Sequence, residues 1–357
     1  MVDQELLVQS ANAMRGFTPP TINRNFTGKH IVTVEQFGRD DMQIIFEAAH
    51  ALRERVRNGN RTLLNLCAGQ VMATLFYEAS TRTDMSFQAA MSRLGGQVIA
   101  TSGGVQFSSV YKGENLADTV RAVACYSDVI VLRHPEVGSS YEAAYHLDQL
   151  AGKLTRRAVL ISGGDGIGEH PTQALLDLYT ILDYKKRIDE LKITMVGDLR
   201  YGRTVHSLSK LIARYGARRV TLNFVSPHSL TMPTAIVDYL RAHEITVSET
   251  DNLTDVLSES DVIYWTRVQE ERFSDKAEYQ AIANKFIMLP ETLNRAKSDA
   301  ILMHPLPRKH EMGTPEDHAV LDADARSVYF HQMENGMYIR MALIAAVLGA
   351  SEPRHDR

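Results

Sequence analysis

Cysteine is nearly absent from this sequence, since only Cys67 and Cys125 occur among 357 residues. Each lies in an apolar stretch, so neither a disulfide framework nor a CxxC metal site is available. We also expect no signal peptide, because Asp3 and Glu5 stand where such a peptide would carry positive charge. Both absences suit a reducing compartment, and we expect a cytoplasmic protein.

Long apolar runs and a net positive charge are missing as well. The most apolar run, residues 341–350, has about half the length that a membrane span needs. The net charge of −4 and the pI near 6.4 give no overall attraction to nucleic acid or to an anionic membrane. We therefore expect neither of them as a partner, and any basic site must be local.

The length and composition that remain indicate a folded protein of two domains. A chain of 357 residues is long enough for two cores of ordinary size, since domains usually contain roughly 100–200 residues. Hydrophobic residues make up 44% and charged residues 23%, without the polar, charge-rich bias of a disordered chain.

Short apolar runs rich in strand formers alternate with helical patterns along the chain. A run such as VMATLFY is typical of a strand buried on both faces of a sheet. This alternation predicts an α/β fold with two doubly wound domains, each with a central parallel sheet flanked by helices. The expected strands cover residues 71–77, 128–133, 158–162, 192–198, 220–225, 261–267 and 300–304.

The stretch YEASTRTDMSF, residues 77–87, places three hydroxyls and one arginine between a buried strand and a helix. Unpaired N–H groups and the positive end of the dipole attract an anion at a helix start. Ser80, Thr81, Arg82 and Thr83 therefore predict a phosphate-sized socket. From spacing alone, the alternative that this stretch is only an N-cap beside a solvated arginine is about as well supported as the phosphate socket, because such caps are common.

Polar residues of a matching kind follow other predicted strands and open helices. Arg133, Arg267 and His304 stand at strand ends, and Arg203 opens a helix. Cations gathered on one side of a sheet are costly unless anions bind there, and ligands of such folds sit beyond the carboxyl ends of the strands. The pattern predicts a cleft for acidic substrates. His170 and Gln173 open a further helix, although a lone histidine there is more often structural.

Eight motifs in order extend this pattern over nearly the whole chain, from about residue 26 to residue 349. Together they resemble the catalytic chains of the aspartate carbamoyltransferase family, which make N-carbamoyl-L-aspartate and phosphate from carbamoyl phosphate and L-aspartate early in pyrimidine synthesis. The motifs are FYEASTRTDMSF, YKGENLADT, LRHPE, GDGIGEHPTQALLDLYTI, MVGDLRYGRTVHSL, YWTRVQEERF, HPLPR and ENGMYIRMALIAAVLG.

The resemblance implies a carbamoyl phosphate site in the first half of the chain. Arg82 would also face the bridging oxygen, where charge grows as phosphate leaves. Thr83, Arg133 and His170 would polarise the carbamoyl oxygen, and Gln173 would face the carbamoyl amino group. The residues implied to hold the phosphate are Ser80, Thr81, Arg82 and Thr83.

The second half of the chain is similar to the part of the family that binds aspartate. The resemblance implies that Arg203, Arg267 and Gln269 bind the two carboxylates. The backbone carbonyls of Pro305 and Leu306 would orient the reacting groups, with Leu306 also close to aspartate.

A shared active site is also implied by the resemblance. Ser108 and Lys112 correspond to a loop that, in this family, reaches the site of the neighbouring subunit in a cyclic trimer, where Lys112 would lie near both substrates. The mechanism that the resemblance implies is a direct attack of the aspartate amine on the carbamoyl carbon, with no protein nucleophile, cofactor or metal. Charged substrates in a cationic cleft suggest that the domains close on binding.

The expected domains are a carbamoyl phosphate-binding domain, residues 1–170 with 329–357, and an aspartate-binding domain, residues 171–328. The C-terminal segment is too apolar to remain exposed, and the family pattern returns it as a helix to the first domain. Asp84 departs from the family pattern, which often has a basic or small residue there; we expect its side chain to point along the helix, away from the ligand.

Three other functions stay open. An ornithine carbamoyltransferase shares the phosphate motif but is expected to carry HCLP and SMG, whereas this sequence has HPLP and no SMG. A dinucleotide-binding oxidoreductase is weaker, because GGDGIG and VGDLRYG do not match GxGxxG. An inactive scaffold would have lost substrate ligands, and none of those ligands is missing here.

Overall fold

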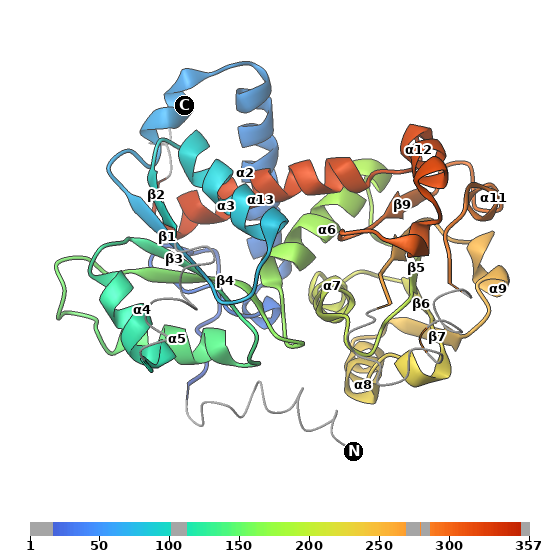
Figure 1. The fold of residues 1–357 in the computed structure, drawn as a ribbon, viewed down its shortest axis with the longest axis horizontal. Coiled ribbons are helices and arrows are strands. Elements are labelled where there is room, and N and C mark those ends of the chain that lie inside the picture. The colour runs from blue at the N-terminus through green and yellow to red at the C-terminus, as the bar shows by residue number, and fades with distance from the viewer. Residues whose placement is uncertain (1–16, 101–112, 269–278, 280–285, 351–357) are drawn as a thin grey trace. The chain divides into compact units, whose positions relative to one another are not determined.

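The computed structural model describes residues 17–100, 113–268, 279 and 286–350. The chain divides into two compact units (Figure 1), one made of Met1–Leu176 with Asn335–Arg357 and the other of Asp177–Glu334. Each division falls six residues after the domain boundary expected from the sequence, at 170 and at 328. Both divisions lie inside helices, α6 (Pro171–Lys185) and α13 (Tyr329–Val347), rather than in loops.

Among the residues that the structure describes, four parallel strands form the sheet of the first unit, in the order β2-β1-β3-β4. Ala73 in the central strand pairs with Ile99 on one side and Ile130 on the other, so that strand is hydrogen-bonded along both edges. The strands are β1 (Val71–Phe76), β2 (Gln97–Ala100), β3 (Val129–His134) and β4 (Val159–Asp165). The parallel pairing confirms the α/β fold expected for this half.

Helices cover this sheet because each presents an apolar stripe to it. Val120 and Leu147, from neighbouring helices that lie side by side in Figure 1, pack with Ile130 and Leu132 of β3 into one buried cluster. Asn115 begins one of these helices by accepting a hydrogen bond from the Asp118 amide, 2.8 Å away. The helices are α2 (Arg39–Arg57), α3 (Thr81–Arg93), α4 (Leu116–Ala124) and α5 (Ser139–Asp148), with short 3₁₀ turns η1 (Val34–Gln36) and η2 (Arg61–Asn65).

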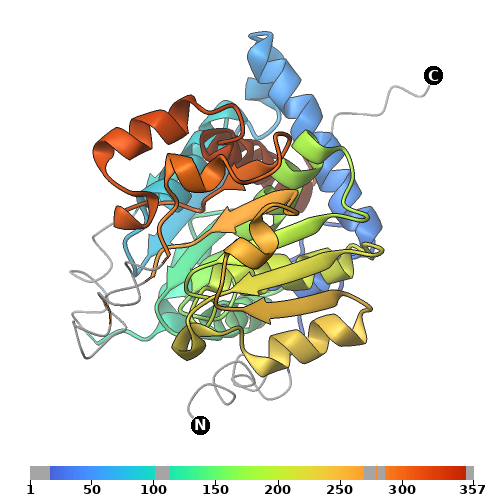
Figure 2. The same ribbon diagram turned by 90° about the vertical axis from the view of Figure 1, so that its right-hand side faces the viewer.

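In the described part of the second unit, five parallel strands form the sheet, in the order β7-β6-β5-β8-β9. Figure 2 shows strands of this sheet side by side, and Met195 in the middle strand pairs with Phe224 and Tyr264. The strands are β5 (Lys192–Val196), β6 (Thr221–Val225), β7 (Thr246–Thr250), β8 (Val262–Trp265) and β9 (Ile301–Met303). The second half therefore also has the doubly wound architecture that the sequence predicts.

A core cluster that contains the buried Trp265 and Tyr329 also contains Leu257, Leu293 and Leu321 from three helices of the second unit. The helices of this unit flank its sheet. They are α7 (Arg203–Arg214), α8 (Thr234–Ala242), α9 (Thr254–Leu257), α11 (Pro290–Leu293) and α12 (Pro315–Ala323), with 3₁₀ turns η5 (His228–Leu230) and η7 (His310–Met312). No helix among the described residues has both the length and the apolar character needed to cross a bilayer.

The last part of α13 belongs to the first unit. Val347 accepts a hydrogen bond from the Gly28 amide at 2.8 Å, and Asn335 accepts one from Arg53 at 3.2 Å. The guanidinium of Arg340 lies 5.0 Å from the centre of the Phe87 ring on α3. These contacts agree with the expected return of the C-terminal helix.

A buried histidine on α7 makes the second unit sensitive to acid. Burial lowers the pKa of His206 to about 4, and its Nε2 lies 2.7 Å from the Leu199 carbonyl, so neutral His206 donates to that oxygen. An unfolded chain binds this proton near pH 6.5. The stability contributed by neutral His206 is therefore fully present above pH 6.5 and is lost as the pH falls toward 4, by about 3 kcal/mol in total.

We expect His206→Gln, which keeps a donor for the Leu199 carbonyl but cannot titrate, to lose less stability than the wild type between pH 6.5 and pH 4.5. Urea unfolding of both proteins at the two pH values measures the difference. The matched control is His243→Gln, at the exposed end of α8, which should retain the acid sensitivity of the wild type. Equal acid sensitivity of His206→Gln and wild type would contradict this account.

Candidate functional site

The candidate anion site lies where β1 ends and α3 begins. The first helical hydrogen bond of α3 runs from the Asp84 amide to the Ser80 carbonyl, 3.0 Å, so the amides of Thr81, Arg82 and Thr83 have no partner within the helix. Ser80 is the N-cap residue, yet its side chain makes no capping bond. These amides and hydroxyls remain available to an anion.

Arg82 adds a positive charge to this helix start. In the parts of the chain that the structure describes, the side chains of Ser80, Thr81 and Arg82 make no hydrogen bond or ion pair. More than a third of Arg82 is exposed, and the surrounding protein lowers its pKa by desolvation. The guanidinium still carries its charge at neutral pH.

Asp84, which departs from the family pattern, does not block the anion site at the start of α3. Asp84 is buried, and its Oδ1 accepts a hydrogen bond of 2.8 Å from Gln88, one turn further along α3. The carboxylate is thereby engaged along the helix, in the direction expected from the sequence. A negative charge in the first turn also suits the helix dipole.

Thr83 connects the anion site to His170. The Oγ1 of Thr83 lies 3.4 Å from Nε2 of the buried His170, which follows β4. The His170 carbonyl accepts the amides of Gln173 and Ala174, at 3.0 and 3.1 Å, and so begins α6. The structure thus brings Thr83 and His170 into contact and places Gln173 on the first turn beside them.

Two carboxylates that sequence reasoning missed hold the loop before His170. Oε2 of the buried Glu169 accepts hydrogen bonds from the Thr33 hydroxyl, 3.0 Å, and the Val34 amide, 2.8 Å. Asp165 accepts the Glu169 amide at 2.7 Å. The sequence carries a signal for both, since acidic residues stand one and five positions before the histidine in DGIGEH.

Arg133 lies at the end of β3, between β1 and β4. Its guanidinium donates to the Gly163 carbonyl at 3.2 Å and pairs with Glu78 at 2.8 Å. The Tyr77 amide donates to the Arg133 carbonyl at 2.9 Å. Three adjacent strands therefore end in Ser80–Thr83, Arg133 and His170, at one edge of the first sheet.

In the second unit, the predicted cationic residues follow adjacent strands of the other sheet. Arg203 opens α7 after β5, and Arg267 follows β8. Gly197, at φ +117°, lies so close to Thr266 that a Cβ atom there would stand 2.4 Å from the Thr266 carbonyl oxygen. Only glycine lets the loop before Arg203 pack against the strand end before Arg267.

The HPLPR loop follows β9 at the same edge of the second sheet. Leu306 has a left-handed backbone, φ +53°, and a cis bond joins it to Pro307. Arg308 anchors the end of the loop, because its guanidinium donates to Asp322 at 2.7 Å and to the Tyr329 hydroxyl at 3.1 Å. Pro305 and Leu306 are both partly exposed.

Three predicted site residues, Ser108, Lys112 and Gln269, lie outside the described residues. In the part of the chain that the structure describes, no three His, Cys, Asp or Glu side chains gather as a metal site.

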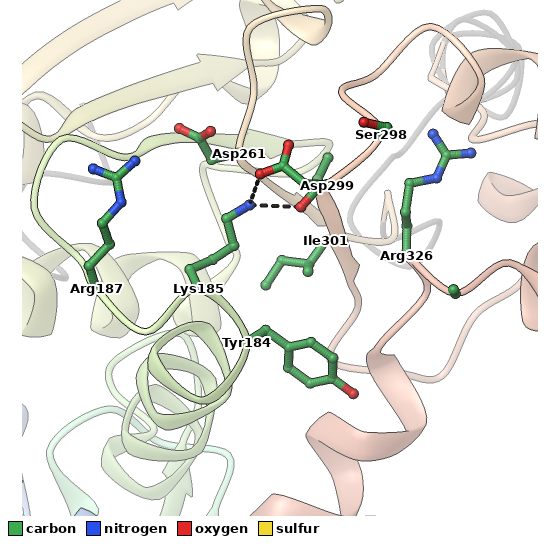
Figure 3. A pocket seen from close by; sticks show the side chains of 10 residues that line it. Tyr184, Lys185, Arg187, Asp261, Ser298, Asp299, Ile301 and Arg326 are labelled. Atoms are coloured by element: carbon green, nitrogen blue, oxygen red, sulfur yellow. Dashed lines mark hydrogen bonds and ion pairs between the residues drawn. The ribbon is translucent and has the colours of Figure 1, made fainter.

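A cavity of about 350 Å³ lies at the opposite edge of the second sheet, beside Asp261 and Ala300, which precede β8 and β9 (Figure 3). Its charges pair with one another or with nearby groups. Lys185 reaches both the carbonyl and the carboxylate of Asp299, at 2.7 and 3.0 Å, and Arg326 pairs with Asp324 at 2.6 Å. The cavity shares no residue with the predicted site.

Two family profiles match successive parts of the chain. Residues 29–183 match "Aspartate/ornithine carbamoyltransferase, carbamoyl-P binding domain". Residues 189–347 match "Aspartate/ornithine carbamoyltransferase, Asp/Orn binding domain".

Curated relatives are 46–47% identical to this chain over the aligned residues. The aspartate carbamoyltransferase catalytic subunit of Methanocella arvoryzae is 46% identical over 326 residues, which cover 91% of this chain and 99% of that protein. Multifunctional protein CAD of Squalus acanthias is 46% identical over 91% of this chain, and multifunctional protein pyr1-3 of Dictyostelium discoideum is 47% identical over 92%. The chain spans 14% of the length of each of these two multifunctional proteins.

Solved structures of aspartate transcarbamoylase from Trypanosoma cruzi are similar over the same extent. The complex with N-(phosphonacetyl)-L-aspartic acid has a TM-score of 0.81 and 38% identity, covering 92% of this chain and 98% of that chain. The complex with carbamoyl phosphate and aspartate has a TM-score of 0.81 and 39% identity, covering 93% of this chain and 100% of that one.

We expect Arg82→Ala to weaken the binding of inorganic phosphate at least about tenfold, since a hydrogen bond to a charged group contributes about 1.5–3 kcal/mol. The control is Arg93→Ala, which removes an exposed arginine from the other end of α3 and should leave phosphate affinity unchanged. Isothermal titration calorimetry measures both. Equal affinities of the two variants would contradict an anion site at the start of α3.

Proposed function

The chain belongs to the aspartate/ornithine carbamoyltransferase family, and on that premise we propose that it is an aspartate carbamoyltransferase. It transfers the carbamoyl group of carbamoyl phosphate to the amino group of L-aspartate and releases N-carbamoyl-L-aspartate and phosphate. This product serves pyrimidine synthesis.

The observation that carries the proposal is the donor set at the start of α3. The side chains of Ser80, Thr81 and Arg82 have no partner among the described residues, and three helix amides stand beside them. Such a set suits the phosphate of carbamoyl phosphate. Thr83, His170 and Arg133 lie at neighbouring strand ends, where they can polarise the carbamoyl oxygen.

The second unit supports aspartate as the acceptor. Arg203 and Arg267 follow adjacent strands, and two guanidinium groups suit an amino acid with two carboxylates. Ornithine has a second ammonium group in place of the second carboxylate and would be repelled there. Gln269 is assigned to the same substrate, and the carbonyls of Pro305 and Leu306 orient the reacting groups.

The reaction needs no covalent intermediate with the protein. The neutral amine of aspartate attacks the carbamoyl carbon, and the bond from that carbon to the bridging oxygen breaks. Phosphate leaves with the electron pair and accepts the proton that the amine gives up. Arg82 stabilises charge on the bridging oxygen, while Thr83, Arg133 and His170 stabilise charge on the carbamoyl oxygen. Catalysis thus comes from positioning and preorganised positive charge.

The direct test incubates the purified chain with carbamoyl phosphate and either L-aspartate or L-ornithine. We expect carbamoyl aspartate from the first mixture and no citrulline from the second. Arg267→Ala should raise the aspartate concentration needed for half-maximal rate by about 10- to 100-fold, because it removes a charged hydrogen bond to substrate. Activity with ornithine alone would overturn the choice of acceptor.

The proposal includes a cyclic trimer with active sites shared between subunits. Ser108 and Lys112, which fall outside the described residues, would come from a neighbouring subunit and complete the charge around the phosphate. A head-to-tail interface of this kind closes into a ring. A cytoplasmic location is also part of the proposal, supported by the two free cysteines.

Mixed trimers test the shared site. Arg82→Ala and Lys112→Ala are each expected to be inactive. When the two are dissociated and reassembled in equal amounts, about a quarter of the sites should receive both wild-type residues, from different subunits. The measurement is activity after mixing, beside each variant reassembled alone. If mixed trimers form but stay as inactive as their parents, Ser108 and Lys112 do not belong to a shared site.

A further inference from the structure

A chain of hydrogen bonds runs through the interior of the second unit to the HPLPR loop. The Tyr264 hydroxyl on β8 donates to Oδ2 of Asp177 on α6, at 2.7 Å. The side-chain amide of Gln332 on α13 donates to Oδ1 of the same carboxylate, also at 2.7 Å. The His304 backbone amide, directly after β9, donates to the Gln332 carbonyl oxygen at 2.9 Å. We call these four residues the Asp177 network.

Because the Asp177 network is buried, each donor in it must face an acceptor, and this fixes which group donates in each hydrogen bond. Tyr264, Asp177 and Gln332 are 0% exposed and His304 is 1% exposed. A polar group in such surroundings is costly unless it is hydrogen-bonded. Because Gln332 presents its NH₂ group to the carboxylate, its carbonyl oxygen is turned toward His304. Asp177 thereby sets the amide orientation that holds the backbone at His304.

The loop that begins at His304 depends on such support. Nδ1 of His304 accepts the Leu306 amide at 2.8 Å, and on the other side of the ring Nε2 lies 3.2 Å from the buried Glu311. Leu306 has a left-handed backbone, φ +53°, which costs a residue other than glycine about 1–2 kcal/mol. A strained backbone of this kind persists only where contacts with the surrounding structure hold it in place.

We propose that Asp177 and Gln332 are positioning residues for the reaction. They touch no substrate, and they act through the His304 amide by fixing the backbone that presents the carbonyls of Pro305 and Leu306. The proposal rests on the proposed function, which gives those carbonyls their role. It extends that function to two buried residues on helices that the sequence motifs alone do not connect with the loop.

Loss of the Asp177 network should displace the loop without unfolding it. Arg308 still anchors the far end of the loop to Asp322 and Tyr329. The carbonyls then move relative to the other reacting groups, and a misplacement of about 1 Å costs on the order of a hundredfold in rate. The phosphate residues Ser80–Thr83 belong to the other unit and share no bond with the network.

The test compares two replacements of the same glutamine. Gln332→Met has a similar volume but no donor and only a weak acceptor, and we expect its kcat to fall about 10- to 100-fold. The double variant Asp177→Asn with Gln332→Glu exchanges donor and acceptor: the new amide donates to the new carboxylate, which still accepts the His304 amide. The Tyr264 hydroxyl retains an oxygen acceptor. We expect the kcat of this double variant to lie within about threefold of the wild type.

A buried network elsewhere in the same sheet supplies the control. Asn223 on β6 donates to the Thr194 hydroxyl at 3.2 Å, and both residues are buried. Asn223→Leu should lower the melting temperature but leave kcat unchanged at 25 °C. Affinity for inorganic phosphate should equal that of the wild type in all variants. If Gln332→Met does not fold, Gln332→Asn, whose side chain is one methylene shorter, replaces it. We expect its kcat to lie below that of the wild type, by less than the loss expected for Gln332→Met.

Three results would overturn the inference. The first is a folded Gln332→Met protein with wild-type kcat, and the second is a double variant as impaired as Gln332→Met. The third is an equal loss of kcat in Asn223→Leu at the same melting temperature, which would indicate a purely structural role.

Hydrogen exchange separates this inference from the proposed function. A wild-type chain that makes no carbamoyl aspartate would overturn the function. Exchange of the His304 amide still reports whether the Asp177 network holds the loop: it should be slow in the wild type, fast in Gln332→Met and slow again in the double variant. Unchanged exchange in Gln332→Met would contradict the network whatever the activity.

Discussion

Parallel pairing of strands is the constraint on which the rest of this molecule depends. Because every strand of a parallel sheet points the same way, all carboxyl ends meet at one edge, and every helix that follows presents unpaired amides there. In the first unit this edge gathers Ser80–Thr83, Arg133 and His170 from three adjacent strands. In the second it gathers Arg203, Arg267 and Pro305–Leu306. Residues that are far apart in the sequence thus become neighbours because they follow different strands of one sheet.

The sequence predicts the central strands well because those strands are buried on both faces and read as continuous apolar runs. Expected strands at 71–77 and 192–198 occur as Val71–Phe76 and Lys192–Val196. The edge strands β2 and β7 are absent from the expectation, since Gln97, Ile99 and most of Thr246–Thr250 are exposed and carry little apolar signal. The unit boundaries lie inside α6 and α13, which local patterns cannot reveal, because a helix looks the same on both sides of a boundary.

The predicted site residues carry charge or hydroxyls at strand ends, and that pattern is visible in the sequence. The residues that hold them are less visible. Glu169 and Asp165 support His170 through backbone amides and a hydroxyl, and Asp177 reaches His304 only through Gln332, 155 residues away from it in sequence. Such bonds depend on which helices the fold brings together. The local signal for such a residue is a carboxylate within an apolar helix, but this signal does not show which residue the carboxylate bonds.

Gly197 sets a limit on how this architecture can diversify. Its Cα stands so close to the Thr266 carbonyl that a methyl group has no room, so the first residue after β5 is fixed by packing with β8 rather than by any ligand. Gly202 is constrained within the same loop, since a Cβ atom there would stand 2.5 Å from the Asp198 carbonyl oxygen, and Asp198 and Leu199 are buried. Arg200 and Tyr201 are partly exposed. New substrate preferences on this fold can therefore arise by changing Arg200 and Tyr201 in the middle of the loop, while Gly197 stays with the scaffold.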